Sequence, residues 1–133
     1  MSFDARKLLD VAKQISSSFH NEETYRTSIN RAYYSAYLQC NKKIIDEMGI
    51  KPNNNNNFSH KTVINFLNDK KYTAPTGVPT PATRIYFQIA GLLRQLKDSR
   101  VDADYYLNKT ISHQNCVDAI NTAQDILDQL NKI

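Results

Sequence analysis

Glycine is scarce in this chain, and long hydrophobic runs are missing. Three of the 133 residues are glycine, too few for a turn-rich β protein or for a glycine-rich loop that cradles phosphate. No window approaches the roughly 20 apolar residues of a membrane span, and the N-terminus lacks the pattern of a signal peptide. We therefore expect a cytoplasmic protein without membrane contact.

Cysteine and histidine are also rare, and neither has the spacing of a metal site. Cys40 and Cys116 occur singly, with no Cys-x-x-Cys or His-x-x-x-His pair, so a zinc site has no support. Both cysteines fall on apolar faces of predicted helices, where a reduced thiol behaves as a small hydrophobic group. We predict two buried free thiols, no metal and no cofactor.

Positive and negative side chains are nearly balanced in number. The 17 Lys and Arg against 13 Asp and Glu leave a formal net charge of +4 and no long basic run. This balance permits RNA or another acidic partner but does not argue for one.

What the chain does contain is helical periodicity. Apolar residues make up 41% of the sequence and recur at spacings of three and four over residues 4–18, 22–48 and 60–68, from Pro81 onward, and after Ser112. The stretches between them at about 50–58 and 72–81 carry five consecutive asparagines and several prolines, so we expect mobile loops there. We predict an all-α fold in one domain, residues 1–133, built as a four- to five-helix up-and-down bundle.

The longest predicted helix carries two stripes. One is apolar and forms the core face. It comprises Tyr25, Ile29, Ala32, Tyr33, Ala36, Tyr37, Cys40, Ile44 and Met48. The second stripe, Thr27, Arg31, Tyr34 and Leu38, lies roughly opposite the first. It is either a solvated surface or a second interface, which would be a pocket or a partner subunit. From its aromatic and apolar character we predict a homodimer.

A second arginine continues the apolar face of its helix. Arg100 has to be paired or to bind an anion if it is buried, and Asp104 follows it at i+4. A structural ion pair is one interpretation. The other is a groove in which Arg31 and Arg100, with Tyr34 and Tyr105 nearby, bind a phosphate or a nucleotide base.

The histidines offer little catalytic signal. His20, His60 and His113 each lie beside a predicted helix start, where capping, packing or solvent exposure is the ordinary role. No Ser-His-Asp order or nucleophile elbow is visible, so classical hydrolase chemistry is unsupported. His60 is the best of the three, because it opens a helix with a strongly apolar face.

Four segments together resemble a known family. They are residues 31–37 (RAYYSAY), 59–61 (SHK), 92–96 (LLRQL) and 100–105 (RVDADY). In this order and spacing they resemble the small prokaryotic HEPN-domain proteins, over roughly residues 5–131. The resemblance implies a helical bundle that commonly dimerises. It also implies an RNA-cleaving toxin, or a partner of a minimal nucleotidyltransferase, in toxin–antitoxin and antiphage-defence systems.

The chain departs from that family at one motif. Ribonuclease members carry an arginine, four to six residues, and then a histidine that meets the arginine across the dimer. Here Tyr105, Tyr106 and Leu107 occupy the positions five to seven after Arg100. The departure favours a role in binding or regulation over RNA cleavage, and therefore a protein that is not an enzyme.

Three functional hypotheses follow. The first is a HEPN protein that binds a nucleotidyltransferase partner, a nucleotide or RNA. Its binding residues would be Arg31, Tyr34, Arg100, Asp104 and Tyr105. The second is a metal-independent endoribonuclease with an altered site, in which Arg100, Tyr105 and His60 replace the usual pair. The third is a non-catalytic helical interaction module with a structural Arg–Asp pair.

Overall fold

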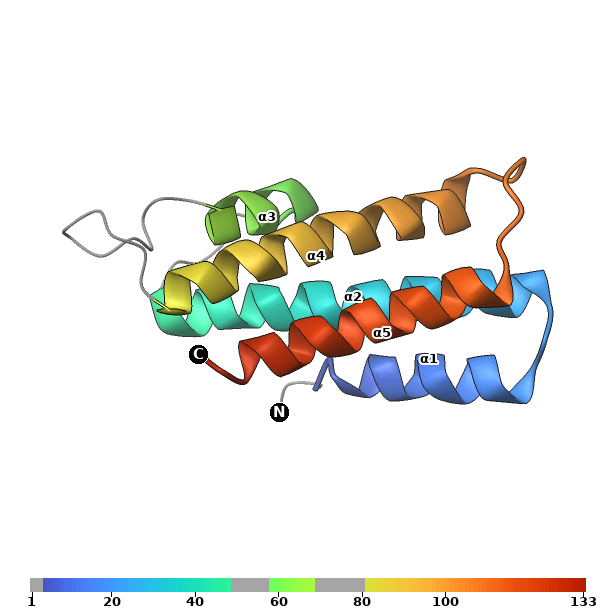
Figure 1. Cartoon of the computed structure of the whole chain (residues 1–133), viewed down its shortest axis with the longest axis horizontal. Helices are drawn as coiled ribbons and strands as arrows, with labels where there is room; N and C mark the ends of the chain where they lie inside the picture. The colour runs from blue at the N-terminus through green and yellow to red at the C-terminus, as the bar shows by residue number, and fades with distance from the viewer. Residues whose placement is uncertain (1–3, 49–57, 69–80) are drawn as a thin grey trace.

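Five helices make up the computed structural model, which describes residues 4–48, 58–68 and 81–133. They are α1 (Lys7–Ser18), α2 (Glu22–Met48), α3 (His60–Asn68), α4 (Pro81–Tyr105) and α5 (His113–Leu130). The long helices α2, α4 and α5 lie side by side, α1 packs on α2 and α5, and α3 packs on α4 and α2 (Figure 1). The all-α prediction is confirmed, and the described residues form a bundle of five helices.

The helix bounds follow the sequence prediction closely, with one difference at the N-terminus. α1 begins at Lys7 instead of residue 4, because the Asp4 carboxylate accepts hydrogen bonds from the backbone and guanidinium of Arg6 and forms a turn there. α4 runs through Ser99 without a break. The loops expected at about 50–58 and 72–81 lie almost entirely outside the described residues.

Three helices begin with a side-chain cap from Asn or Ser, the residue types that favour this position. Asn21 Oδ1 accepts a hydrogen bond from the backbone N–H of Thr24 at 2.9 Å, at the start of α2. Ser59 caps α3 in the same way. Ser112 and Asn115 form a reciprocal capping box at the start of α5. These caps satisfy N–H groups that have no partner within the helix.

α2 is the centre of the core. Its predicted apolar stripe is buried from Ile29 to Ile44, and its two ends differ: Tyr25 is half-buried, and the side chain of Met48 lies outside the described residues. Cys40 and Cys116 are both buried and free, and burial raises the pKa of the Cys40 thiol to about 12. None of the described helices is long and apolar enough to cross a membrane.

Candidate functional site

Arg100 lies inside the bundle, on the face of α4 that packs against α2. Its exposed fraction is 7%, and its guanidinium carbon lies 5.2 Å from the ring centre of Tyr33, 5.7 Å from that of Tyr34 and 5.6 Å from that of Tyr105. Two rings come from α2 and one from the last residue of α4. A buried cation therefore has three aromatic neighbours.

Hydrogen bonding satisfies this guanidinium only in part. One of its terminal nitrogens lies 3.4 Å from Asp104 Oδ2, and the same oxygen accepts a shorter bond, 3.0 Å, from the Asn30 side chain. The Nε of Arg100 is buried and has no hydrogen-bond partner among the described residues. Burial opposes its charge, but Tyr34 and hydrogen bonding to Tyr105 and Asp104 outweigh it and raise the pKa of Arg100. The side chain stays charged with donor capacity to spare.

Arg31 lies at the edge of this cluster. Its side chain is exposed, and its guanidinium donates to Asn30 Oδ1 at 3.1 Å. Asn30 in turn bonds to Asp104, which contacts Arg100. The two arginines predicted to share one groove are therefore connected through Asn30.

His60, the first residue of α3, completes the cluster from a third helix. Its Nδ1 is hydrogen-bonded to the Tyr33 hydroxyl. Its ring stacks on Tyr37 with centres 4.4 Å apart and planes at 19°, and it meets Tyr34 edge-on at 5.8 Å. The position of the imidazole is thus set by three tyrosines of α2.

Burial determines the protonation states of His60 and Tyr33. Burial lowers the pKa of His60, and the positive charges of Arg100 and Lys97 lower it further. Burial raises the pKa of Tyr33 far above its ordinary value, so this hydroxyl keeps its proton at neutral pH. When Tyr33 donates to Nδ1, the proton of the neutral imidazole sits on Nε2. Nε2 makes no hydrogen bond to a described residue.

The residue that leads into α3 is held by α2 on both sides. The Tyr37 hydroxyl donates to the backbone carbonyl of Phe58, and Asn41 Oδ1 accepts from the backbone N–H of Phe58 at 2.8 Å. These bonds fix the start of α3, and therefore His60, against α2.

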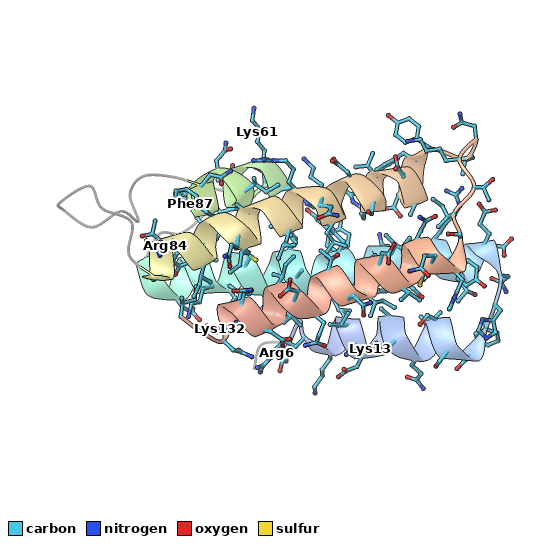
Figure 2. All side chains as sticks on the ribbon, in the orientation of Figure 1. Arg6, Lys13, Lys61, Arg84, Phe87 and Lys132 are labelled. Carbon is cyan, nitrogen blue, oxygen red and sulfur yellow. The ribbon has the colours of Figure 1, made fainter. Side chains whose placement is uncertain are left out.

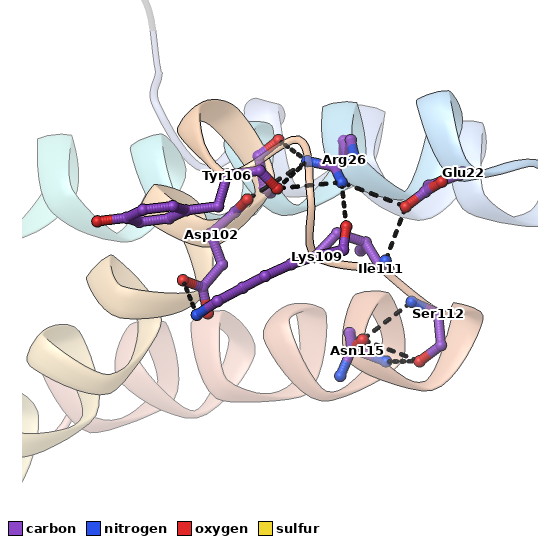
Figure 3. A network of polar contacts seen from close by, with 9 residues as sticks. Glu22, Arg26, Asp102, Tyr106, Lys109, Ile111, Ser112 and Asn115 are labelled. Atoms are coloured by element: carbon purple, nitrogen blue, oxygen red, sulfur yellow. Dashed lines mark hydrogen bonds and ion pairs between the residues drawn. The ribbon is translucent and has the colours of Figure 1, made fainter.

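A separate polar network holds the end of α4. Arg26, on the first turns of α2, reaches across to the carbonyl oxygens that end α4 and begin the following loop (Figure 3). Its backbone acceptors are Asp102, Ala103, Tyr106 and Lys109, at 2.5 to 3.4 Å. Glu22 accepts from Arg26 at 3.2 Å and from the backbone of Ile111 at 2.8 Å. This network fixes the turn of α4 that carries Asp104 and Tyr105.

Beyond that turn the chain exposes apolar side chains. Tyr105 is 68% exposed, Tyr106 48% and Leu107 85%. Tyr105 also contacts Arg100, so its ring extends from the buried guanidinium to solvent. It forms the rim of the site.

The other histidines lie elsewhere. His20 and His113 contact each other at 5.6 Å, and His113 contacts Tyr25 at 5.4 Å, near the turn between α1 and α2. Among the described residues, no group of three or more His, Cys, Asp or Glu side chains could hold a metal ion.

The structure brings most of the sequence-predicted residues together. Tyr34, His60 and Arg100 contact Tyr33. Asp104 and Tyr105 contact Arg100, and Arg31 lies at the rim. Three members were not predicted as site residues: Asn30, Tyr33 and Tyr37. The signal was available for the tyrosines, because a hydroxyl on a core-facing stripe needs a partner. We name Asn30, Arg31, Tyr33, Tyr34, Tyr37, His60, Arg100, Asp104 and Tyr105 the Arg100 cluster.

Comparisons of the chain with protein-family models, with curated proteins and with solved structures find no match.

Proposed function

We propose that this chain is a HEPN-type protein that binds a phosphate-bearing ligand, a nucleotide or RNA, at the Arg100 cluster. Its biological setting would be a toxin–antitoxin or antiphage-defence system, with a minimal nucleotidyltransferase as the partner. The observation that carries the proposal is the state of Arg100. It is 7% exposed, its ion pair with Asp104 measures 3.4 Å, and its Nε lacks a partner among the described residues.

A buried guanidinium with unused donors is costly unless an anion meets it. A phosphate oxygen would supply an acceptor to the terminal nitrogens of the guanidinium, and phosphate geometry suits the fork of donors on arginine. Tyr105, exposed on one side and in contact with Arg100 on the other, offers a face for a base to stack on. His60 Nε2 offers a further donor at the same cluster.

The second candidate function is the metal-independent ribonuclease with an altered site. One observation favours it: the neutral imidazole of His60 lies in one cluster with Arg100 and Tyr105. In the other tautomer, in which Nδ1–H donates to the Tyr33 oxygen, the free Nε2 can accept the proton of an attacking ribose hydroxyl, and an arginine can stabilise the charge that develops on phosphorus-bound oxygens. The two functions share a ligand and differ in whether it is cleaved.

The substitution Arg100→Met tests the proposal. Anisotropy titrations with a fluorescent single-stranded RNA, and calorimetry with ATP, should show binding by the wild type and at least a tenfold loss in Arg100→Met. Arg6→Met is the control, because Arg6 is exposed and paired with Asp4 on the α1 side of the bundle. Absence of wild-type binding to both probes, or full binding by Arg100→Met, would overturn the proposal.

The same RNA separates the two functions. Intact RNA after incubation with the wild type supports binding alone. Cleavage that His60→Gln abolishes supports the ribonuclease. Recovery of a nucleotidyltransferase with the protein purified from its native host would support the partner.

A further inference from the structure

Asp104, on the last turn of α4, uses only one of its carboxylate oxygens within the chain. Oδ2 accepts a hydrogen bond from the Asn30 side chain at 3.0 Å and lies 3.4 Å from the Arg100 guanidinium. Oδ1 accepts no hydrogen bond from a described residue. The side chain is 23% exposed. Since a carboxylate can accept several hydrogen bonds, Asp104 keeps acceptor capacity at the edge of the Arg100 cluster.

The Asn30–Asp104 pair lies between two guanidinium groups in a continuous row of polar contacts. On one side, the exposed Arg31 donates to Asn30 Oδ1 at 3.1 Å. On the other side, Asp104 contacts the buried Arg100. The shorter contact of Asp104 goes to Asn30, so the position of the carboxylate is not set by Arg100 alone. The row presents a cation, a hydrogen-bond acceptor and a second cation.

This row restricts the ligand, because a carboxylate repels phosphate and can only accept hydrogen bonds. A bound ligand must therefore place a donor at Asp104 and negative charge at Arg31 and Arg100. An RNA strand has this pattern: each ribose lies between two phosphates, and its 2′-hydroxyl is on the carbon next to the one that carries the 3′-phosphate. A DNA strand has the phosphates but lacks the hydroxyl.

Positive charge cannot distinguish between the two strands. Figure 2 shows Lys61 and Arg84 on α3 and the start of α4, and Arg6 and Lys13 beside α1. Charges spread over the molecule in this way attract RNA and DNA through the same phosphates. A preference for one sugar needs a group that contacts the sugar, and Asp104 supplies the one carboxylate of the Arg100 cluster.

We propose that Asp104 makes the Arg100 cluster select RNA over DNA, by accepting a hydrogen bond from a ribose 2′-hydroxyl. This inference rests on the proposed function and names the part of the ligand that the site distinguishes. Arg31 and Arg100 bind the phosphates on either side of that ribose, and the exposed ring of Tyr105 stacks on a base. Asp104 sets the preference, because the phosphate contacts are common to both strands.

The ratio of RNA affinity to DNA affinity tests the proposal. In anisotropy titrations with two fluorescent single strands of the same sequence, both carrying uracil, the wild type should bind the RNA about tenfold more tightly than the DNA. Asp104→Asn keeps the size of the side chain, but its one oxygen serves Asn30 and Arg100, and an amide N–H replaces the free acceptor. The ratio should fall to about 1, whereas DNA binding should not weaken. Asp102→Asn, at a carboxylate paired with Lys109 on another face of α4, is the matched control and should keep the wild-type ratio.

A chemical change in the ligand supplies a second measurement, which does not depend on the folding of a variant. RNA with 2′-fluoro sugars keeps the phosphates and a group of similar size at the 2′ position, but it cannot donate a hydrogen bond there. The wild type should bind it as weakly as it binds DNA. Equal binding of RNA and DNA, equal binding of RNA and 2′-fluoro RNA, or an unchanged ratio in Asp104→Asn would overturn the inference and leave phosphate binding in place. Binding of none of the three strands would overturn the proposed function as well.

Discussion

Arg26 and Arg100 are both drawn into the bundle, but they are satisfied in opposite ways. Arg26 donates to four backbone carbonyls and to Glu22, at distances down to 2.5 Å. Arg100 lies 3.4 Å from Asp104, hydrogen-bonds to Tyr105 and has three aromatic rings around its guanidinium, and its Nε has no partner among the described residues. Arg26 makes several short hydrogen bonds within the chain, whereas Arg100 makes one long contact to Asp104 and has one nitrogen without a partner among the described residues.

The difference in hydrogen bonding indicates different roles for Arg26 and Arg100. A guanidinium whose two terminal nitrogens meet carbonyl and carboxylate oxygens, as those of Arg26 do, ties two segments together. The Arg100 guanidinium is held by three aromatic rings and by hydrogen bonds to Asp104 and Tyr105, and its Nε remains without a partner among the described residues. Arg26 is therefore a structural residue, and Arg100 is the centre of the proposed binding site. The four predictions below test this contrast.

The largest effect on stability is expected at Arg26. Arg26→Met leaves several carbonyls at the end of α4 without their donor, so the free energy of unfolding should fall by about 2–4 kcal/mol. Arg100→Met removes a partly satisfied buried charge, and its unfolding free energy should stay within about 1 kcal/mol of the wild type. Urea denaturation followed by circular dichroism measures both. An equal loss of unfolding free energy in the two variants would contradict the assigned difference between Arg26 and Arg100.

The next effect concerns ligand affinity. Tyr105→Ala should weaken RNA binding about tenfold, because one stacking face is lost. Its melting temperature should not change, because the side chain is 68% exposed. Tyr106→Ala is the matched control, since Tyr106 is also exposed and contacts Lys109. A similar loss of affinity in both variants would remove Tyr105 from the site.

A smaller effect should appear when the pH is lowered. Burial and nearby positive charge lower the pKa of His60 in the folded chain below the ordinary 6.5, so the unfolded chain binds more protons between the two values. The contribution of His60 to stability is complete above about pH 6.5 and is lost as the pH falls through the folded pKa. The melting temperature of His60→Gln should therefore fall less than that of the wild type between pH 7.5 and 5.

The control for this pH experiment is His20→Gln, because His20 is exposed at the turn between α1 and α2. It should reproduce the wild-type decrease. If His60→Gln lost as much melting temperature as the wild type on acidification, another group would be responsible.

The smallest effect is expected at Lys109. Its ammonium lies 2.9 Å from the Asp102 carboxylate, but both side chains are substantially exposed. Exposed ion pairs contribute little, so Lys109→Met should change the unfolding free energy by less than about 1 kcal/mol. A loss as large as that of Arg26→Met would mean that the side chain of Lys109, and not only its carbonyl, holds the loop.

The fold was largely readable from the sequence, because the helix signals are local. Asn21, Ser59 and Ser112 mark helix starts through bonds to residues three positions away, and periodicity assigns the buried faces. The role of Arg26 at the end of α4 could not be predicted from such local signals. Its acceptors are carbonyls 76 or more residues away, and any residue type could supply them.

The part of the site that depends on local spacing could also be predicted from the sequence. Arg100 and Asp104 share one helix face, so their proximity follows from spacing alone. The contact between His60 and Tyr33 joins α3 to α2 across 27 residues, and it depends on how α3 docks. Asn30, which joins Asp104 to the rim, adjoins Arg31 in sequence, but no local pattern distinguishes it from other polar residues of α2.

The short length of α3 has a thermodynamic consequence. A helix of nine residues does not persist alone in water, so α3 remains helical because it is docked on α2 and α4. In the Arg100 cluster, His60 belongs to α3 and the other members belong to α2 and α4. Docking of α3 and occupancy of the site are therefore linked equilibria, in which a ligand that contacts His60 stabilises the docked state. Amide hydrogen exchange should then slow along all of α3 when the ligand binds, including the turn farthest from His60.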